Sequence, residues 1–220
     1  MAAATTVPTA SPTSTSVRTA APAVTIVRTG VANLASVVAA FERLGARTHI
    51  TTDAAEVAAA AHVMLPGVGA FGAGMGALMA HDLGRALSER VAADRPTIAI
   101  CLGLQLLCQH SEETPGIAGL GIVPAAITRF DDSHVKVPQL GWNRVQVSGA
   151  RYLEPGHAYF ANSFRIADGA ALTGFTVATA DYDGPFVAAL ERGRLLACQF
   201  HPELSGPWGS ALLQRWLEAT

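Results

Sequence analysis

Short runs of β-branched and apolar residues alternate with longer amphipathic segments from Val24 onward, and this alternation constrains the fold more than any other feature. It is typical of a parallel sheet whose strands are joined by crossover helices. In the first half of the chain we expect strands over 24–27, 48–50, 62–65 and 97–100. We expect helices over 32–44, 83–93 and 102–110, and a short helix that begins with Asp53 and Glu56 as a capping box.

The second half of the chain is rich in strand and turn patterns. After Pro115 we expect strands over 126–130, 143–147, 172–179, 187–190 and 195–200, followed by a last helix over about 210–219. The sequence therefore predicts one α/β domain over residues 24–220. Its expected architecture is a three-layer, doubly wound, flavodoxin-like fold with a mostly parallel sheet and an added antiparallel section.

Composition excludes several classes of protein. Of the 220 residues, 50% are hydrophobic and 15% are charged, so bulk disorder is excluded. The net charge is -2 and Lys136 is the only lysine, which leaves little to bind a nucleic acid or an anionic membrane. Three cysteines are an odd number, which argues against a disulfide framework and for a reducing compartment. We therefore expect a cytoplasmic protein whose partners are small molecules or other proteins.

Two segments need separate treatment. Residues 1–23 are almost wholly Ala, Thr, Ser and Pro, and we expect a disordered tail, with a misplaced start or a targeting segment as open alternatives. Residues 57–79 carry no charge and are long enough to cross a bilayer. Pro66 and the glycines after it would interrupt such a helix, so we expect no membrane span.

Cys101 stands between a buried strand and the start of a helix, with Gly103 two residues further on. This is the layout of a nucleophile elbow, in which a tight turn exposes the reactive group above the edge of the sheet. The helix start would favour the thiolate. The alternative is that Cys101 is a small buried core residue, as free cysteines commonly are.

His201 and Glu203 follow a strand and are two residues apart. In an extended chain such residues project to the same side, so Glu203 could orient the imidazole while His201 acts as base and acid toward a thiol. Taken alone, His201 could equally be a structural or surface histidine. Pro202 would end the strand and stiffen the pair.

A metal site is the competing interpretation of the cysteines and His201. Cys101 and Cys108 are seven residues apart on the expected helix, about 10 Å by the helical rise, which is too far for one ion. Cys198 and His201 would point to opposite faces of a strand. We therefore expect no metal and assign Cys108 and Cys198 to the core.

A glycine-rich turn, Leu65-Pro66-Gly67-Val68-Gly69-Ala70-Phe71-Gly72, directly follows a buried strand. It lacks the register of a dinucleotide fingerprint and the Lys-Ser/Thr end of a P-loop. It could be a plain turn. It could also donate backbone N–H groups to an oxyanion at the neighbouring strand end.

Together these segments resemble the class I glutamine amidotransferases, and among them the glutaminase subunits of imidazole glycerol phosphate synthases. The resemblance runs from about Val24 to Leu217. Its markers are Asn33-Leu34-x-Ser36-Val37, Pro66 to Gly72, Cys101-Leu102-Gly103-x-Gln105, Ser111-Glu112-Glu113, Lys136-Val137-Pro138-x-x-Gly141-Trp142-Asn143, Tyr159-Phe160-x-Asn162-Ser163 and Gln199-Phe200-His201-Pro202-Glu203.

The resemblance implies a role for each matching position. Cys101 would be the nucleophile, His201 the general base and acid, and Glu203 the orienting carboxylate. The backbone N–H groups of Val68 and Leu102 would form the oxyanion hole. The glutamine substrate would be held by Gly67, Gly69, Gln105, Glu113, Asn162, Ser163 and Phe164, and the partner would dock near Asn33 and Trp142.

The implied reaction is hydrolysis of glutamine to glutamate and ammonia through a cysteinyl thioester, with no cofactor. The ammonia would pass to a cyclase of (β/α)₈ fold, which makes imidazole glycerol phosphate and an aminoimidazole carboxamide ribotide in histidine biosynthesis. Two alternatives stay open. The chain could serve another synthase, or it could be a catalytically silent partner-binding module.

Some positions depart from the family pattern. Gln139 and Asn162 occupy frequent histidine positions, and Leu204 replaces a usual lysine or arginine. Arg28 and Ala32 also differ from the usual residues. Because we expect Arg28, Gln139 and Leu204 near the docking surface, we predict one interfacial ion pair fewer than is typical.

Overall fold

The computed structural model describes residues 21–30, 34–170 and 172–219. The predicted disordered tail therefore falls almost entirely outside the described residues, as do Ala32 and Asn33. The main sheet has seven strands in the order β10-β11-β12-β4-β3-β1-β2. Its strands are β1 (Ala23–Val27), β2 (Arg47–Thr51), β3 (His62–Leu65), β4 (Thr97–Ile100), β10 (Thr176–Asp181), β11 (Pro185–Arg192) and β12 (Leu195–Cys198).

The helices and the smaller sheets complete the fold. The helices are α1 (Leu34–Arg43), α2 (Ala54–Ala59), α3 (Phe71–Ala80), α4 (Leu83–Ala92), α5 (Leu102–Leu106), the 3₁₀ turn η1 (Pro202–Leu204) and α6 (Gly206–Glu218). A three-stranded sheet is formed by β5 (His110–Ser111), β6 (Ala126–Arg129) and β9 (Phe164–Arg165), and a two-stranded one by β7 (Gln139–Val145) and β8 (Gly156–Asn162).

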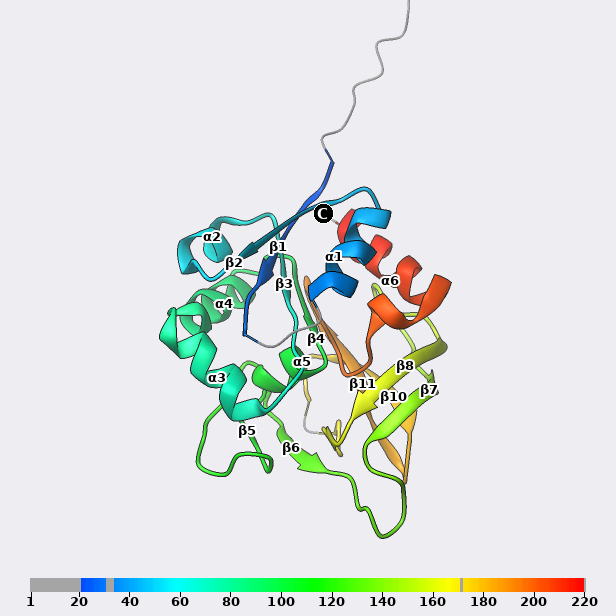
Figure 1. Ribbon diagram of the computed structural model, residues 1–220. Coiled ribbons are helices and arrows are strands. Elements are labelled where there is room, and N and C mark those ends of the chain that lie inside the picture. The colour runs from blue at the N-terminus through cyan, green and yellow to red at the C-terminus, as the bar shows by residue number, and fades with distance from the viewer. Residues whose placement is uncertain (1–20, 31–33, 171, 220) are drawn as a thin grey trace, which may run out of the picture.

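The main sheet is parallel from β12 through β4, β3 and β1 to β2, whereas β10 and β11 add antiparallel pairs at the other edge. Helices α1 and α6 lie on one side of the sheet and α2, α3 and α4 on the other (Figure 1). This confirms the prediction of an α/β fold with a mostly parallel sheet, helices on both faces and an antiparallel section.

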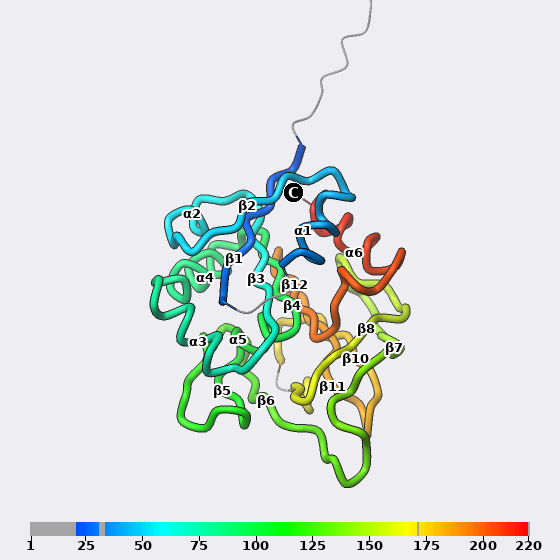
Figure 2. Tube along the Cα trace, viewed as in Figure 1, coloured from blue at the N-terminus to red at the C-terminus, as the bar shows by residue number. Residues whose placement is uncertain are grey.

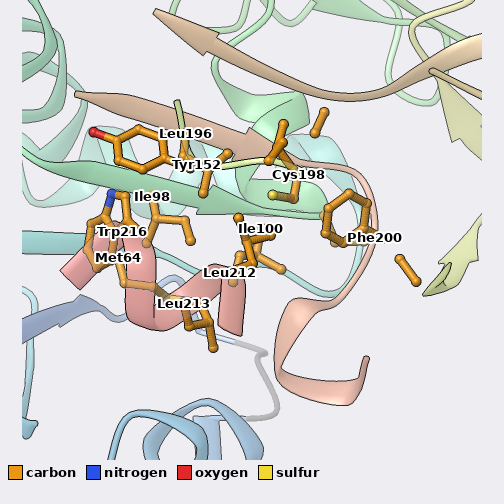
Figure 3. Close-up of a cluster of buried hydrophobic side chains, with 14 of the residues drawn as sticks. Met64, Ile98, Ile100, Tyr152, Leu196, Cys198, Phe200, Leu212, Leu213 and Trp216 are labelled. Carbon is orange, nitrogen blue, oxygen red and sulfur yellow. The ribbon is translucent and has the colours of Figure 1, made fainter. Parts of the chain in front are cut away.

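Two apolar cores flank the sheet because side chains alternate along each strand. On β4, Ile98 and Ile100 face the core under α1 and α6, while Ala99 faces the core under α2 to α5. Figure 3 shows the first core, where Leu212 and Trp216 of α6 lie against the strand residues. Burying this alternating set on both faces fixes the strand registers, since a one-residue slip would exchange the two faces.

The sheet order sets the position of the site. Strands β12, β4 and β3 are adjacent and parallel, so their carboxyl ends meet at one edge of the sheet (Figure 2). Cys101 follows β4, the turn Pro66–Ala70 follows β3, and Gln199 to Glu203 follow β12. Ligands of open α/β sheets bind at such an edge.

The glycine-rich stretch behaves differently from the prediction. We expect Pro66 and the glycines to interrupt a helix over 57–79, and they do separate α2 from α3. We predict no helix over the glycines themselves, whereas residues 71–80 form α3 with Gly72, Gly74 and Gly76 inside it. A Cβ on Gly72 would lie 2.8 Å from Thr114, and one on Gly74 would lie 3.0 Å from Leu106. The glycines therefore allow α3 to pack closely, and this tertiary packing outweighs their low helix propensity.

The helix after Cys101 is shorter than predicted. It ends at Leu106 instead of continuing to residue 110, because the Gln109 N–H donates to the Ala125 carbonyl and His110 pairs with Ala126 in β5 and β6. The helix whose N-terminus we expect to favour the thiolate of Cys101 therefore has only five residues.

The predicted capping box is half confirmed. Asp53 Oδ1 accepts hydrogen bonds from the N–H groups of Ala55 and Glu56, at 2.7 and 3.1 Å. Glu56 does not return the bond, because its Oε2 lies 2.8 Å from His49 Nε2. The Asp53 N–H donates to Thr51 Oγ1 instead.

The second half contains two strands that the prediction omits, β8 and the two-residue β9, although the buried Ala158, Phe160 and Asn162 of β8 alternate as a strand requires. Within the described ranges, no helix is long and apolar enough to cross a membrane.

Candidate functional site

Cys101 lies in a strained turn at the end of β4. Its φ of 53° is in the left-handed region that non-glycine residues rarely adopt, and its N–H donates to the Cys198 carbonyl at 2.7 Å. A Cβ on Gly103 would collide with the Leu65 carbonyl. The predicted nucleophile elbow is therefore present, and its glycine is required because β3 and α5 approach so closely.

His201 and Glu203 are in direct contact. Nδ1 of His201 lies 2.8 Å from Oε1 of Glu203, and the side chains are 8% and 6% exposed. The local geometry differs from the extended chain that we expect, because Pro202 begins η1 and only His201 is extended. The tight turn, and not the alternation of side chains along a strand, therefore brings His201 and Glu203 together.

The backbone fixes His201 from both sides. Its N–H donates to the Tyr159 carbonyl of β8 at 2.9 Å, and its carbonyl accepts a bond from Ser205 Oγ at 2.6 Å. The same hydroxyl oxygen accepts the Tyr159 N–H at 3.0 Å. The imidazole is thus anchored to β8 as well as to its own turn.

The pKa of His201 reflects opposing effects. Burial lowers it, but hydrogen bonds to Cys101 and Glu203, together with the negative charges of these partners, outweigh burial and raise the pKa to about 10. An imidazole of this kind keeps its proton at neutral pH, as a proton donor to a leaving amine requires.

A cavity of about 200 Å³ opens beside Cys101 and His201. Most of the predicted site residues line it, namely Val68, Gly69, Cys101, Leu102, Gln105, Glu113, Asn162, Ser163, Phe164 and His201. Ala161, which we did not single out from the sequence, also lines it. Gly67 and Glu203 line a second, more apolar cavity of about 170 Å³ that His201 also borders.

The turn after β3 is held against α5. The Leu102 N–H, which we expect in the oxyanion hole, donates to the Gly67 carbonyl at 3.3 Å. A Cβ on Gly67 would lie 2.5 Å from the Leu102 Cβ, so only glycine allows this approach. In this conformation the Leu102 donor is occupied by the protein itself.

The polar residues of the first cavity are already partly bonded. Glu113 Oε2 accepts the N–H of Phe71 at 2.6 Å, which ties Glu113 to the start of α3. Gln105 Nε2 donates to the Phe164 carbonyl at 3.3 Å and to Gln199 Oε1 at 3.0 Å. Gln199 is fully buried and is a site residue that sequence reasoning missed, although it stands two positions before His201.

Three large apolar side chains are exposed next to the site, on β7 and η1. Leu140 is 68% exposed, Trp142 is 59% exposed and Leu204 is 42% exposed. The Trp142 ring stacks edge-on against Tyr159, with the ring centroids 6.3 Å apart. Gln139 is only 3% exposed, so its side chain is not available to the docking surface on which we expect it.

The other cysteines belong to the core, as predicted. Cys108 and Cys198 are free and fully buried, and burial raises the pKa of both thiols. No group of three metal-ligating side chains occurs in the part of the chain that the structure describes.

Comparison with known proteins adds the class and then the family. The family model for class I glutamine amidotransferases matches residues 26–219, so the chain belongs to this class. A solved structure described as a glutamine amidotransferase shares the fold, with a TM-score of 0.70 at 18% identity over 88% of this chain and 96% of that one.

Within the class, the chain belongs to the HisH subunits of imidazole glycerol phosphate synthase. The HisH subunit of Rhodopirellula baltica is 40% identical over 86% of this chain and 94% of its own length. That of Herpetosiphon aurantiacus is 42% identical over 86% and 90%. The chloroplastic hisHF protein of Arabidopsis thaliana is 36% identical over 86% of this chain and 33% of its own length.

Proposed function

We propose that this glutaminase uses Cys101 as its nucleophile, with His201 as the proton carrier and Glu203 as the group that orients it. The observation that carries this proposal is the buried His201–Glu203 pair beside a strained cysteine at a cavity. In the first step Sγ bonds to the carboxamide carbon of glutamine. The carbon–nitrogen bond then breaks, and His201 gives its proton to the departing ammonia.

Water completes the cycle. It attacks the γ-glutamyl thioester carbon and gives a proton to His201, and the carbon–sulfur bond breaks to release glutamate. The Glu203 carboxylate keeps one imidazole nitrogen engaged, so that the other faces the sulfur and the substrate.

Both steps pass through a tetrahedral oxyanion. The Leu102 N–H could stabilise it only after the Gly67 carbonyl has moved away, since that carbonyl now accepts its hydrogen bond. Rotation of the Gly67–Val68 peptide would free the Leu102 donor and could turn the Val68 N–H toward the same oxygen. Two donors would then act on the oxyanion, and each is worth on the order of 10² to 10³ in rate.

The first cavity supplies complementary groups for glutamine. Glu113 brings a negative charge that suits the α-ammonium group of the substrate. Both amide hydrogens of Gln105 are bonded within the protein, so only its carbonyl oxygen is left for the ligand, and this oxygen would accept an N–H. Asn162, Ser163 and Phe164 form the remaining wall.

The second cavity gives ammonia a way out toward a partner. Its walls are largely apolar and it reaches Leu204, which is an exposed apolar side chain like Leu140 and Trp142 of β7. We assign this surface to the docking of the (β/α)₈ cyclase, because an exposed apolar patch marks a protein interface. A closed interface would keep ammonia from being protonated in water.

A cytoplasmic location accords with the three free cysteines.

The test is glutamate release from glutamine, measured with and without a candidate cyclase. We expect the partner to stimulate release and ammonia to appear in the cyclase product. Stimulation by a different synthase would identify another acceptor pathway. Glutamate release equal to the uncatalysed rate with every partner would make the chain a binding module.

A further inference from the structure

Gln199 is a fully buried polar residue immediately after β12, and the proposed chemistry does not use it. Its Nε2 donates to Sγ of Cys101 at 3.6 Å, a normal distance for a hydrogen bond to sulfur. Its Oε1 accepts a hydrogen bond from Gln105 Nε2 at 3.0 Å. Two side-chain amides therefore connect the cavity wall to the proposed nucleophile.

One backbone carbonyl fixes the direction of these hydrogen bonds. The carbonyl of Phe164 can only accept, so Gln105 must turn its NH₂ group toward it, at 3.3 Å. The same NH₂ group then faces Gln199, which must present its oxygen in return. It follows that Gln199 presents N–H, and not a carbonyl oxygen, to the sulfur of Cys101.

Asn162 reinforces this order of hydrogen-bond donors and acceptors. Its Nδ2 also donates to the Phe164 carbonyl, at 3.0 Å, which fills the second acceptor position of that oxygen. A reversed Gln105 would place its own oxygen against the Phe164 oxygen inside a buried site, and such an unpaired contact is costly. The order of donors and acceptors from Phe164 to Cys101 is therefore set by the fold.

We propose that Gln199 is a further catalytic residue, whose side-chain amide stabilises the anionic sulfur of Cys101 by direct hydrogen bonding, and that Gln105 is the positioning residue that holds this amide in the correct orientation. The proposal rests on the proposed role of Cys101 as nucleophile. A hydrogen bond to an ionised acceptor is stronger than one to its neutral form, so an N–H at the sulfur favours the thiolate.

Gln199 and His201 act on the sulfur in different ways. His201 lines the same cavity as Cys101 and exchanges protons during the proposed reaction, whereas the amide of Gln199 has no proton to give at neutral pH. Gln199 is also not among the residues that line the cavity. Its loss should therefore reduce kcat and the reactivity of the thiol, and should leave the KM for glutamine within a few-fold.

The experiment measures alkylation of Cys101 by iodoacetamide as a function of pH, together with kcat and KM for glutamine in the presence of the cyclase. Cys101→Ser supplies the background from Cys108 and Cys198. Gln199→Met removes the donor at nearly constant volume. Gln199→Glu keeps an acceptor for Gln105 and places a carboxylate oxygen at the sulfur. It replaces the methionine variant in the test if circular dichroism shows that Gln199→Met does not fold.

Gln139→Met is the matched control for alkylation, because Gln139 is another buried glutamine and has no hydrogen bond to Cys101 among the described contacts. We expect both Gln199 variants to raise the pH midpoint of alkylation by about one unit or more and to lower kcat roughly tenfold, the worth of one hydrogen bond to a charged group. The control should keep the wild-type midpoint.

Three results would overturn the proposal: a folded Gln199 variant with the wild-type alkylation midpoint, one with wild-type kcat, or one in which only KM changes. Failure of the underlying function is distinguishable, because Cys101→Ser would then keep its glutaminase activity whatever the Gln199 variants do.

Discussion

The imidazole Nδ1 of His201 and the carboxylate Oε1 of Glu203 lie 2.8 Å apart, with more than nine-tenths of each side chain buried. Glu203 Oε2 has no hydrogen-bond partner in the described residues. The carboxylate thus acts on His201 through one oxygen, and this contact fixes which ring nitrogen faces the sulfur.

Replacing Glu203 by glutamine removes that control. We expect Glu203→Gln to fold, because the side chain keeps its shape, and to lose about 10² to 10⁴ in kcat, because the tautomer and charge of His201 are no longer stabilised. Steady-state glutamate release with the cyclase present measures this. A loss of less than about threefold would mean that Glu203 does not orient the base.

The protonation of His201 should depend on Cys101. Burial lowers its pKa, whereas Cys101 and Glu203 raise it, with a net value of about 10 against 6.5 for an unperturbed histidine. In Cys101→Ala one of the two stabilising partners is gone, so the pKa of His201 should fall. Titration of the ring nitrogens by NMR, assigned with a His201→Asn variant, measures the change.

The same shift has a consequence for stability. Because the pKa is raised in the folded state, the contribution of His201 to the free energy of unfolding is fully present below about 6.5 and is lost as the pH rises through about 10. In Cys101→Ala this loss should begin at the same pH, near 6.5, but should be smaller and complete at a lower pH. Denaturant unfolding at a series of alkaline pH values tests it, and identical pH profiles for the two proteins would refute it.

The exposed tryptophan should carry much of the docking energy. Trp142 is 59% exposed and stacks on Tyr159, so Trp142→Ala should weaken cyclase binding by about 30-fold or more, as loss of an aromatic anchor does. Met79→Ala is the control, since Met79 is 75% exposed on α3, across the molecule from β7 (Figure 1). Titration calorimetry measures both affinities, and equal losses would argue against this docking surface.

Two glycines of the glycine-rich stretch should respond oppositely to alanine. At Gly67 the added methyl would overlap Leu102 and the Gly103 nitrogen, so Gly67→Ala should lower Tm and abolish glutaminase activity. At exposed Gly76 in α3 nothing lies within 4 Å, so Gly76→Ala should stabilise the protein by about 0.5 to 1 kcal/mol. Thermal unfolding decides, and equal Tm shifts would contradict the packing described.

The strands of the first half and the cysteine turn could be predicted because their signals are local. Residues 62–65 and 97–100 are short segments with three apolar residues each, next to Pro66 and Pro96, and they form β3 and β4 with those bounds. Helix α3 could not be predicted, because its glycines are favourable only when packed against Leu106 and Thr114, which lie elsewhere in the chain. Long-range packing overrides local propensity there.

The same difference between local signals and long-range packing applies to the site. Cys101 and His201 could be singled out by residue type and spacing, whereas the role of Gln199 depends on Gln105 and Phe164, which come from different elements. A glutamine in an apolar strand end is no signal in itself. Gln199 can be recognised only once the fold places it between the Gln105 amide, which the Phe164 carbonyl orients, and the sulfur of Cys101.

The proposed mechanism requires a covalent intermediate on Cys101. The most direct measurement is acid quenching of the enzyme during turnover with glutamine and cyclase, followed by peptide mapping by mass spectrometry. We expect a γ-glutamyl adduct on the peptide that contains Cys101. The adduct should be absent from Cys101→Ala, which should also fail to release glutamate. Undiminished glutamate release by Cys101→Ala, or an adduct on Cys108 or Cys198 instead, would contradict it.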